Sequence, residues 1–135
     1  LPRAVWKPER AASMRYIAKM DDESDVVIWW LNKAINEAPD RREAYVELAK
    51  HYYEERAWSE CLDAAQRALQ ITEKPLEYLC EEFAWGSAPY DYAAIAAHNL
   101  GLNKVAFEYG QKAVELNPTD ERLQRNLVFY SEGVS

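Results

Sequence analysis

Cysteine is scarce in this sequence of 135 residues, which contains only Cys61 and Cys80. Two thiols are too few for a disulfide framework, so we expect both to be reduced. A zinc site needs four ligands, and His51 and His98 do not stand at ligand-like spacing from either cysteine. The sequence therefore predicts no metal and no cofactor.

Long apolar runs and an excess of basic residues are missing as well. The longest apolar run, around residues 26–31, is far shorter than the roughly 20 residues that cross a bilayer, and no signal-peptide pattern opens the chain. The net charge of −7 disfavours nucleic acid, because phosphate binding depends on lysine and arginine. We expect a cytoplasmic domain without a nucleic-acid or membrane partner, and a basic partner fits the charge best. The start at Leu1 rather than Met suggests a fragment of a longer protein.

Strand patterns are absent, whereas helical periodicity is strong. No stretch alternates apolar and polar residues, so we expect no sheet, although 49% hydrophobic content is enough for one packed core. Apolar residues recur at offsets 0, +1, +4, +7 and +8 in three segments that begin at Val27, Cys61 and Ala106, which is one face of a helix. The first two segments are 34 residues apart and the next two 45, which is 34 plus an insertion of 11.

Each of these helices requires a partner helix before it, because a single helix-turn-helix unit cannot bury its apolar face alone. Offsets of 0, +3, +4 and +7 supply the partner, beginning at Ala11, Tyr45 and Tyr90. Small residues at such contacts let helices approach to roughly 8–10 Å. In the first unit Arg15 takes a small-residue position, which puts the tight packing of that helix in doubt.

The repeats predict an all-α superhelix that forms a single domain over residues 1–135. The expected units cover about 8–41, 42–75 and 87–120, with an insertion at about 76–86 and a C-terminal capping helix at about 120–132. Asp40 with Glu43 predicts a capping box, and Gly101 suits a left-handed helix end. The capping helix should begin at Thr119 or Asp120. Its expected inward residues are Leu123, Leu127 and Tyr130, and its expected outward residues are Arg122 and Arg125.

At these residues the segment from Arg41 to Tyr130 resembles the tetratricopeptide-repeat (TPR) family, which implies a TPR-like α-α superhelix. More narrowly, "RREAYVELAKHYYE", "PLEYLCEEFAWGSAPYDYAAIAAHNLG" and "YGQKAVELNPTDERLQRNL" look like the TPR region that follows the catalytic domain in some bacterial and phage family 2 glycosyltransferases. That resemblance implies an accessory region of an enzyme that transfers a sugar from a nucleotide donor. The alternative is a free-standing TPR adaptor that binds a peptide.

Scaffolds of this family usually bind peptides on the concave face, which the first helix of each unit lines. Only Lys50 stands where chaperone-binding members place several basic residues to clamp carboxylates, and Asp91 opposes it, so the sequence does not predict a clamp. An ordinary solvated helix surface is the alternative to a groove. The expected groove residues are Tyr16, Lys19, Val46, Lys50, Tyr53, Asp91, Ile95, His98 and Asn99.

The insertion resembles a short amphipathic helix after Pro75 that either fills a gap between units or docks an adjoining catalytic domain. Its apolar residues are Leu76, Leu79, Cys80 and Phe83. Trp29 takes an outward position in its helix, and we expect Val5 or Trp6, a second chain or an upstream domain to cover it. The expected contact surface is thus Trp29, Phe83 and Trp85. A homodimer through the first unit remains an alternative to a monomer.

Catalysis is not expected from this chain. The acidic triplet Asp21, Asp22 and Glu23 falls in the turn between the first two helices, where solvated side chains are expected rather than a metal site. His98 beside Asn99 could serve an acid–base catalyst, but an open helical groove lacks the closed pocket that shifts pKa values.

Overall fold

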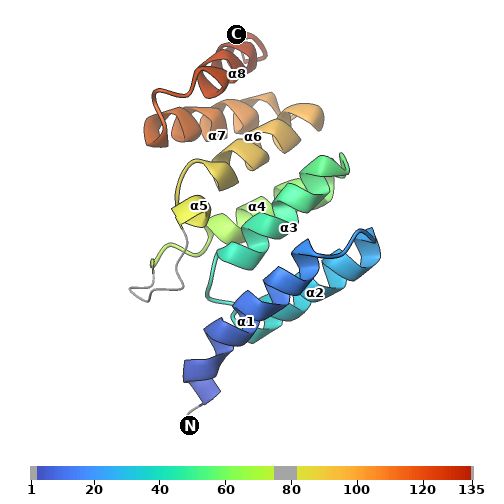
Figure 1. The fold of residues 1–135 in the computed structure, drawn as a ribbon. Helices are drawn as coiled ribbons and strands as arrows, with labels where there is room; N and C mark the ends of the chain where they lie inside the picture. The colour runs from blue at the N-terminus through green and yellow to red at the C-terminus, as the bar shows by residue number, and fades with distance from the viewer. Residues whose placement is uncertain (1–2, 75–81, 135) are drawn as a thin grey trace.

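The computed structural model describes residues 3–74 and 82–134, and within these ranges the chain forms eight helices and no strand (Figure 1). The all-α prediction is therefore confirmed. The helices are α1 (Arg3–Lys19), α2 (Ser24–Glu37), α3 (Glu43–Glu54), α4 (Trp58–Leu69), α5 (Glu82–Trp85), α6 (Ala88–Asn99), α7 (Asn103–Leu116) and α8 (Glu121–Glu132).

Antiparallel helix pairs stack one on another along the molecule (Figure 1). The pairs are α1 with α2, α3 with α4, and α6 with α7, and α8 packs against α7 at the C-terminal end. Contacts between pairs are made mainly by α2 with α3 and by α4 with α6. The helix pairs thus follow one another along the stack in sequence order, and the two termini lie at opposite ends (Figure 1).

Small residues form the contacts at the centre of the stack. Ala34, Ala68 and Ala113 lie in α2, α4 and α7, the second helices of the three pairs, and at most 1% of their surface is exposed. Each of the three predicted repeat segments therefore has a buried alanine at the equivalent position. Gly110 is another small residue at a close helix contact, because a Cβ atom there would lie only 2.7 Å from the Tyr130 ring of α8.

Two of the predicted helix ends are confirmed. The Asp120 carboxylate accepts hydrogen bonds from the backbone N–H groups of Arg122 and Leu123 at the start of α8. Gly101 has a φ of 78° after α6, a left-handed conformation that glycine adopts without strain. Arg56, after α3, also has a positive φ, which the sequence did not suggest.

The predicted capping box of Asp40 and Glu43 is wrong. Helix α3 begins at Glu43, so its N-cap residue is Arg42, and no side chain caps the helix end. Arg42 instead extends away, donating from Nε to the Ile71 carbonyl at 2.7 Å and lying 4.0 Å from the centre of the Trp85 ring. The side chain at this helix end therefore makes tertiary contacts and does not cap the helix.

The first helix begins at Arg3, before the predicted start of its unit at about residue 8, and includes Pro8. Arg15 does not loosen it, because the arginine is 7% exposed and its neighbours on that face, Ala11 and Ala18, are buried too. The arginine extends across to α3, where its guanidinium lies 3.1 Å from a Glu47 carboxylate oxygen.

Most of the predicted insertion helix, including Leu76, Leu79 and Cys80, lies outside the described residues. Its described end is α5, in which Ala84 is fully buried. The Ala84 carbonyl accepts a hydrogen bond from the Arg42 guanidinium at 3.4 Å. Helix α5 is thereby fastened to the start of α3, beside α6.

Candidate functional site

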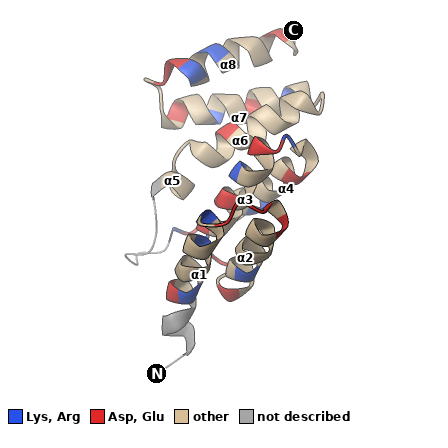
Figure 2. Ribbon diagram, turned by 45° about the vertical axis from the view of Figure 1, so that its right-hand side comes forward, with Lys and Arg blue, Asp and Glu red and all other residues tan. Residues whose placement is uncertain are grey.

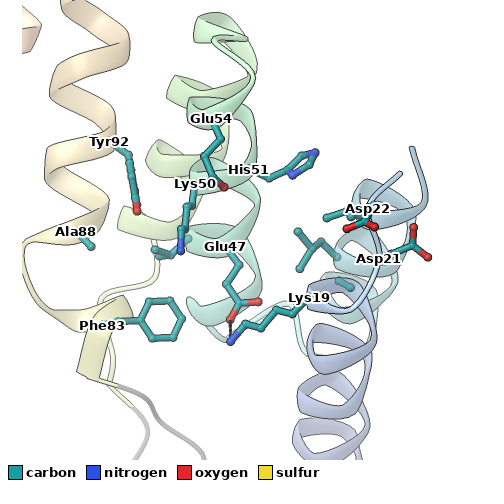
Figure 3. A pocket seen from close by; sticks show the side chains of 14 residues that line it. Lys19, Asp21, Asp22, Glu47, Lys50, His51, Glu54, Phe83, Ala88 and Tyr92 are labelled. Atoms are coloured by element: carbon teal, nitrogen blue, oxygen red, sulfur yellow. Dashed lines mark ion pairs between the residues drawn. The ribbon is translucent and has the colours of Figure 1, made fainter. Parts of the chain in front are cut away.

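A groove of about 490 Å³ opens between the first helix pair and the helices α3, α5 and α6 (Figure 3). Its apolar surface comes from buried or half-buried residues of the repeat core together with Phe83 of α5. The lining residues are Ala18, Lys19, Asp21, Asp22, Val27, Leu31, Val46, Glu47, Lys50, His51, Glu54, Phe83, Ala88 and Tyr92. A cavity of this size with an apolar floor and charged walls is typical of ligand sites.

Three of the predicted groove residues line this groove, namely Lys19, Val46 and Lys50. Val46 is only 1% exposed and belongs to the floor. Lys50 extends from α3 into the space between α3 and α6, toward Phe83 and Ala88 (Figure 3). The N-terminal half of the predicted site is thus brought together by the fold.

The other six predicted groove residues do not line it. Tyr53 packs between Trp58 and Tyr92, with ring centres 6.1 and 5.4 Å away, and Asn99 donates its side-chain N–H to the Ile95 carbonyl at 2.8 Å. The remaining members of this set are Tyr16, which is exposed on α1, Ile95, which is half-buried on α6, and Asp91 and His98, which meet α8.

Helix α8 occupies the C-terminal half of the expected groove. Asp91 is buried and accepts two hydrogen bonds from Arg122, at 3.3 and 2.6 Å, so it does not face a ligand. Arg122 is exposed, as predicted, but its guanidinium turns back to this carboxylate. His98 lies against the rings of Phe129 and Tyr130, at 5.1 and 5.5 Å between ring centres. Helix α8 thus covers Asp91 and His98, whereas the groove lies beside α1, α3, α5 and the start of α6.

Sequence reasoning missed Glu47, which organises one wall of the groove. Its side chain is 10% exposed and lies 3.1 Å from the Arg15 guanidinium and 3.4 Å from the Lys19 ammonium. Figure 3 shows the contact between Lys19 and Glu47 across the groove. The signal in the sequence was Arg15 itself, since an arginine in a small-residue position has to find a carboxylate to be buried.

Acidic side chains gather on the opposite part of the groove. Asp21 and Asp22 lie in the turn between α1 and α2, as the sequence predicted for the acidic triplet (Figure 2), and both line the groove, as does Glu54. Asp21 accepts a hydrogen bond from the Glu23 backbone N–H at 2.9 Å, which holds the turn. The turn is thus part of the site's wall rather than a solvated connection only.

Ser24, His51 and Glu55 form a small polar cluster at the rim of the groove. Ser24 Oγ lies 2.9 Å from His51 Nε2 and donates to Glu55 at 2.8 Å, while Glu55 lies 3.0 Å from the same His51 nitrogen. In a nucleophile–histidine–acid relay the acid and the nucleophile hold opposite nitrogens of the ring. Here both contact Nε2, so the cluster joins α2 to α3 and does not have the relay geometry.

The predicted contact surface falls into three different environments. Trp29 is 56% exposed, with Trp30 edge-on at 4.9 Å and the Lys33 ammonium 5.2 Å from its ring centre. The side chains of Val5 and Trp6, which we expect to cover it, lie outside the described part of the chain. Phe83 is 38% exposed and faces the groove, whereas Trp85 is partly covered by Arg42.

Burial raises the pKa values of one thiol and one phenol, Cys61 and the half-buried Tyr92. Cys61 is a free, fully buried cysteine, as predicted, and burial raises its pKa to about 12. Burial, with the nearby Asp91 charge, likewise raises the pKa of Tyr92 to about 12. Cys61 is therefore a protonated core residue and not a nucleophile.

Within residues 3–74 and 82–134, no three His, Cys, Asp or Glu side chains are grouped so that they could hold a metal ion. No helix among those residues is long and apolar enough to cross a bilayer.

The chain is similar in structure to known TPR domains. It matches the first TPR domain of Spaghetti (RPAP3) bound to the HSP90 peptide SRMEEVD with a TM-score of 0.76 and 14% identity, over 93% of this chain and 96% of that chain. It matches the first TPR domain of human RPAP3 with a TM-score of 0.75 and 14% identity, over 94% of each chain. No protein-family model and no curated protein matches the sequence. The fold is thus that of a TPR domain.

Proposed function

We propose that this chain is a protein-interaction scaffold that binds a segment of another protein in the groove between α1, α3, α5 and α6. The observation that carries the proposal is the groove itself, about 490 Å³ in volume, with an apolar floor and charged walls. An extended peptide or a helix can place apolar side chains on such a floor and polar ones against the walls. Contact, without catalysis, is the proposed activity.

The similar solved structures support this reading. One of them is a TPR domain that holds a peptide, SRMEEVD. Phe83 also supports the proposal, because α5 places a large, partly exposed aromatic ring at the edge of the groove. Aromatic side chains of this kind supply much of the binding energy in protein interfaces.

Peptide selection on the whole chain tests the proposal. Random displayed peptides are selected on the immobilised protein, and the enriched peptides are measured against groove variants by fluorescence anisotropy. We expect Phe83→Ala to weaken binding about tenfold, since truncation of an aromatic side chain that contacts the ligand can cost about 1.4 kcal/mol or more. The matched control is Leu116→Ala on α7, which removes an exposed apolar side chain away from the groove. Enriched peptides that bind both variants equally well would contradict the proposal.

A more specific form of the proposal places the chain beside a family 2 glycosyltransferase domain. It is supported by the resemblance of the segments quoted above to the TPR region that follows such domains. In this form Trp29, more than half exposed on α2, contacts the adjoining domain or a second copy of the chain. The test is to read the codons upstream of Leu1. If those codons encode a glycosyltransferase domain, the result supports an accessory role. If they encode no such domain, it supports a free-standing adaptor. Light scattering on the purified chain separately tests the homodimer.

A further inference from the structure

We infer that the groove selects a cationic segment of its partner, in which lysine or arginine flanks an apolar residue. The inference rests on the proposed function and names the chemistry of the ligand for the same site. It is based on the charged residues of the groove. Some of them form ion pairs within the protein, and the others remain to contact a ligand.

Free carboxylates outnumber free ammonium groups in the groove. The lining residues carry four acidic groups (Asp21, Asp22, Glu47, Glu54) and two lysines (Lys19, Lys50), so their sum is 2 − 4 = −2. Among described residues Asp21, Asp22 and Glu54 form no ion pair, and of the two lysines Lys19 is held by Glu47 at 3.4 Å. Three carboxylates without an ion pair, of which Asp21 also accepts the Glu23 N–H, therefore remain for a ligand, against one ammonium without an ion pair.

Positive and negative side chains lie in different parts of the groove, and this separation determines how a ligand would be oriented. Near Phe83 lie Lys19, Glu47 and Lys50 (Figure 3), and the Arg15 guanidinium is 6.0 Å from the centre of the Phe83 ring. The formal charges of these four residues sum to a positive value. The three free carboxylates lie on the α1–α2 turn and at the C-terminal end of α3. Cationic side chains of a ligand are thus drawn to the turn, while Lys50 can donate to backbone carbonyls of the same segment near Phe83.

Overall charge acts in the same direction. The net charge of the chain is −7, so a basic segment is attracted from a distance and an acidic one is repelled. A ligand rich in carboxylates, such as the peptide SRMEEVD in the similar solved structure, would find a single free ammonium here. The groove therefore fits a ligand of opposite charge to that peptide.

The peptides selected on the chain provide the test. We expect the enriched pool to contain more lysine and arginine than the starting library. A synthetic member of that pool should bind about tenfold or more tightly than its copy with glutamate in place of each basic residue. This preference should shrink as ionic strength rises from about 0.05 M to about 0.5 M, because salt screens exposed charges.

Paired variants separate the groove from the overall charge. The double variant Asp22→Asn with Glu54→Gln removes two groove carboxylates, and it should weaken binding of the basic peptide about tenfold. The control is Asp63→Asn with Glu108→Gln, which changes the net charge equally at exposed sites on α4 and α7. It should change binding less than about twofold, because those charges are screened at that distance.

Each contrary outcome has a separate meaning. Groove-dependent peptides that are neutral or acidic overturn the inference and leave the proposed function standing. A basic peptide that the control weakens as much as the groove variant also overturns the inference, because overall charge would then be the cause. The absence of any groove-dependent peptide overturns the proposed function, and the inference falls with it.

Discussion

Arg56 and Gly101 occupy the same place in the turns of two successive helix pairs, and both have a positive φ, 58° and 78°. In each turn the following residue donates its backbone N–H to a carbonyl of the preceding helix. The bonds run from Ala57 to Tyr52 and from Leu102 to Ala97, each at 2.9 Å. The repeat therefore imposes one backbone conformation on two different residues, only one of which adopts it freely.

The first prediction exploits this difference. Arg56→Gly should raise the free energy of unfolding by about 0.5–1 kcal/mol, because glycine relieves the left-handed strain but loses more entropy on folding. Gly101→Ala should lower it by about 1 kcal/mol through strain alone, since nothing lies within 4 Å of the added Cβ. Urea denaturation measures both. The control Arg56→Ala keeps the strain and should change stability little; a gain equal to that of Arg56→Gly would refute the explanation.

The second prediction concerns the close approach of α7 and α8 at Gly110. A Cβ atom there would lie 2.7 Å from Tyr130 Cδ2, so Gly110→Ala forces the ring to move. Overpacking costs about 1–3 kcal/mol and the better helix propensity of alanine returns about 1, so we expect a net loss of about 1 kcal/mol. In a Tyr130→Leu background the same substitution should become neutral or stabilising, as judged by the melting temperature. An equal loss in both backgrounds would rule out the ring as the cause.

Much of the fold could be predicted because the repeat is a local pattern. The positions of Ala34, Ala68 and Ala113 follow from helical periodicity, and their burial in α2, α4 and α7 follows from stacking. The Asp120 cap and the Gly101 turn are equally local.

The site could be predicted only in part, because it depends on contacts between distant helices. The partner of Arg15 is Glu47 on another helix, and no spacing in the sequence reveals that pair. The helical position of Asp91 predicts a groove residue, but in the structure α8 places Arg122 against its carboxylate. The capping box failed for the same reason, since Arg42 is engaged by Ile71 and Trp85 far along the chain.

The third prediction tests the contact of Asp91 with Arg122. Arg122 of α8 donates two hydrogen bonds to the buried Asp91 of α6 and so joins the two helices. These bonds raise the pKa of Arg122 above its ordinary value. Arg122 is half exposed, so we expect Asp91→Asn to cost about 1–2 kcal/mol of unfolding free energy, at the lower end for charged hydrogen bonds. A double-mutant cycle with Arg122→Ala should show that the two losses are not additive. Additive losses would mean that the pair does not act as a unit.

The fourth prediction is a loss of stability at alkaline pH that originates in the core. Burial raises the pKa of Tyr130 and of Tyr92 from 10.0 to about 12, and that of Cys61 from 9.0 to about 12. The folded chain thus keeps these protons more firmly than the unfolded chain. Their contribution to stability is fully present below the unfolded pKa values and is lost as the pH rises through about 12.

Urea denaturation at a series of pH values between about 8 and 11 should show this decline in the free energy of unfolding. Tyr130→Phe removes one of the three groups, so its decline should be shallower than that of the parent chain, while its stability near neutral pH serves as the reference. Tyr16→Phe is the matched control, because Tyr16 is 65% exposed on α1 and its removal should leave the slope as it was. If the two variants lose stability with pH at the same rate as the parent, burial of Tyr130 is not what couples folding to alkaline pH.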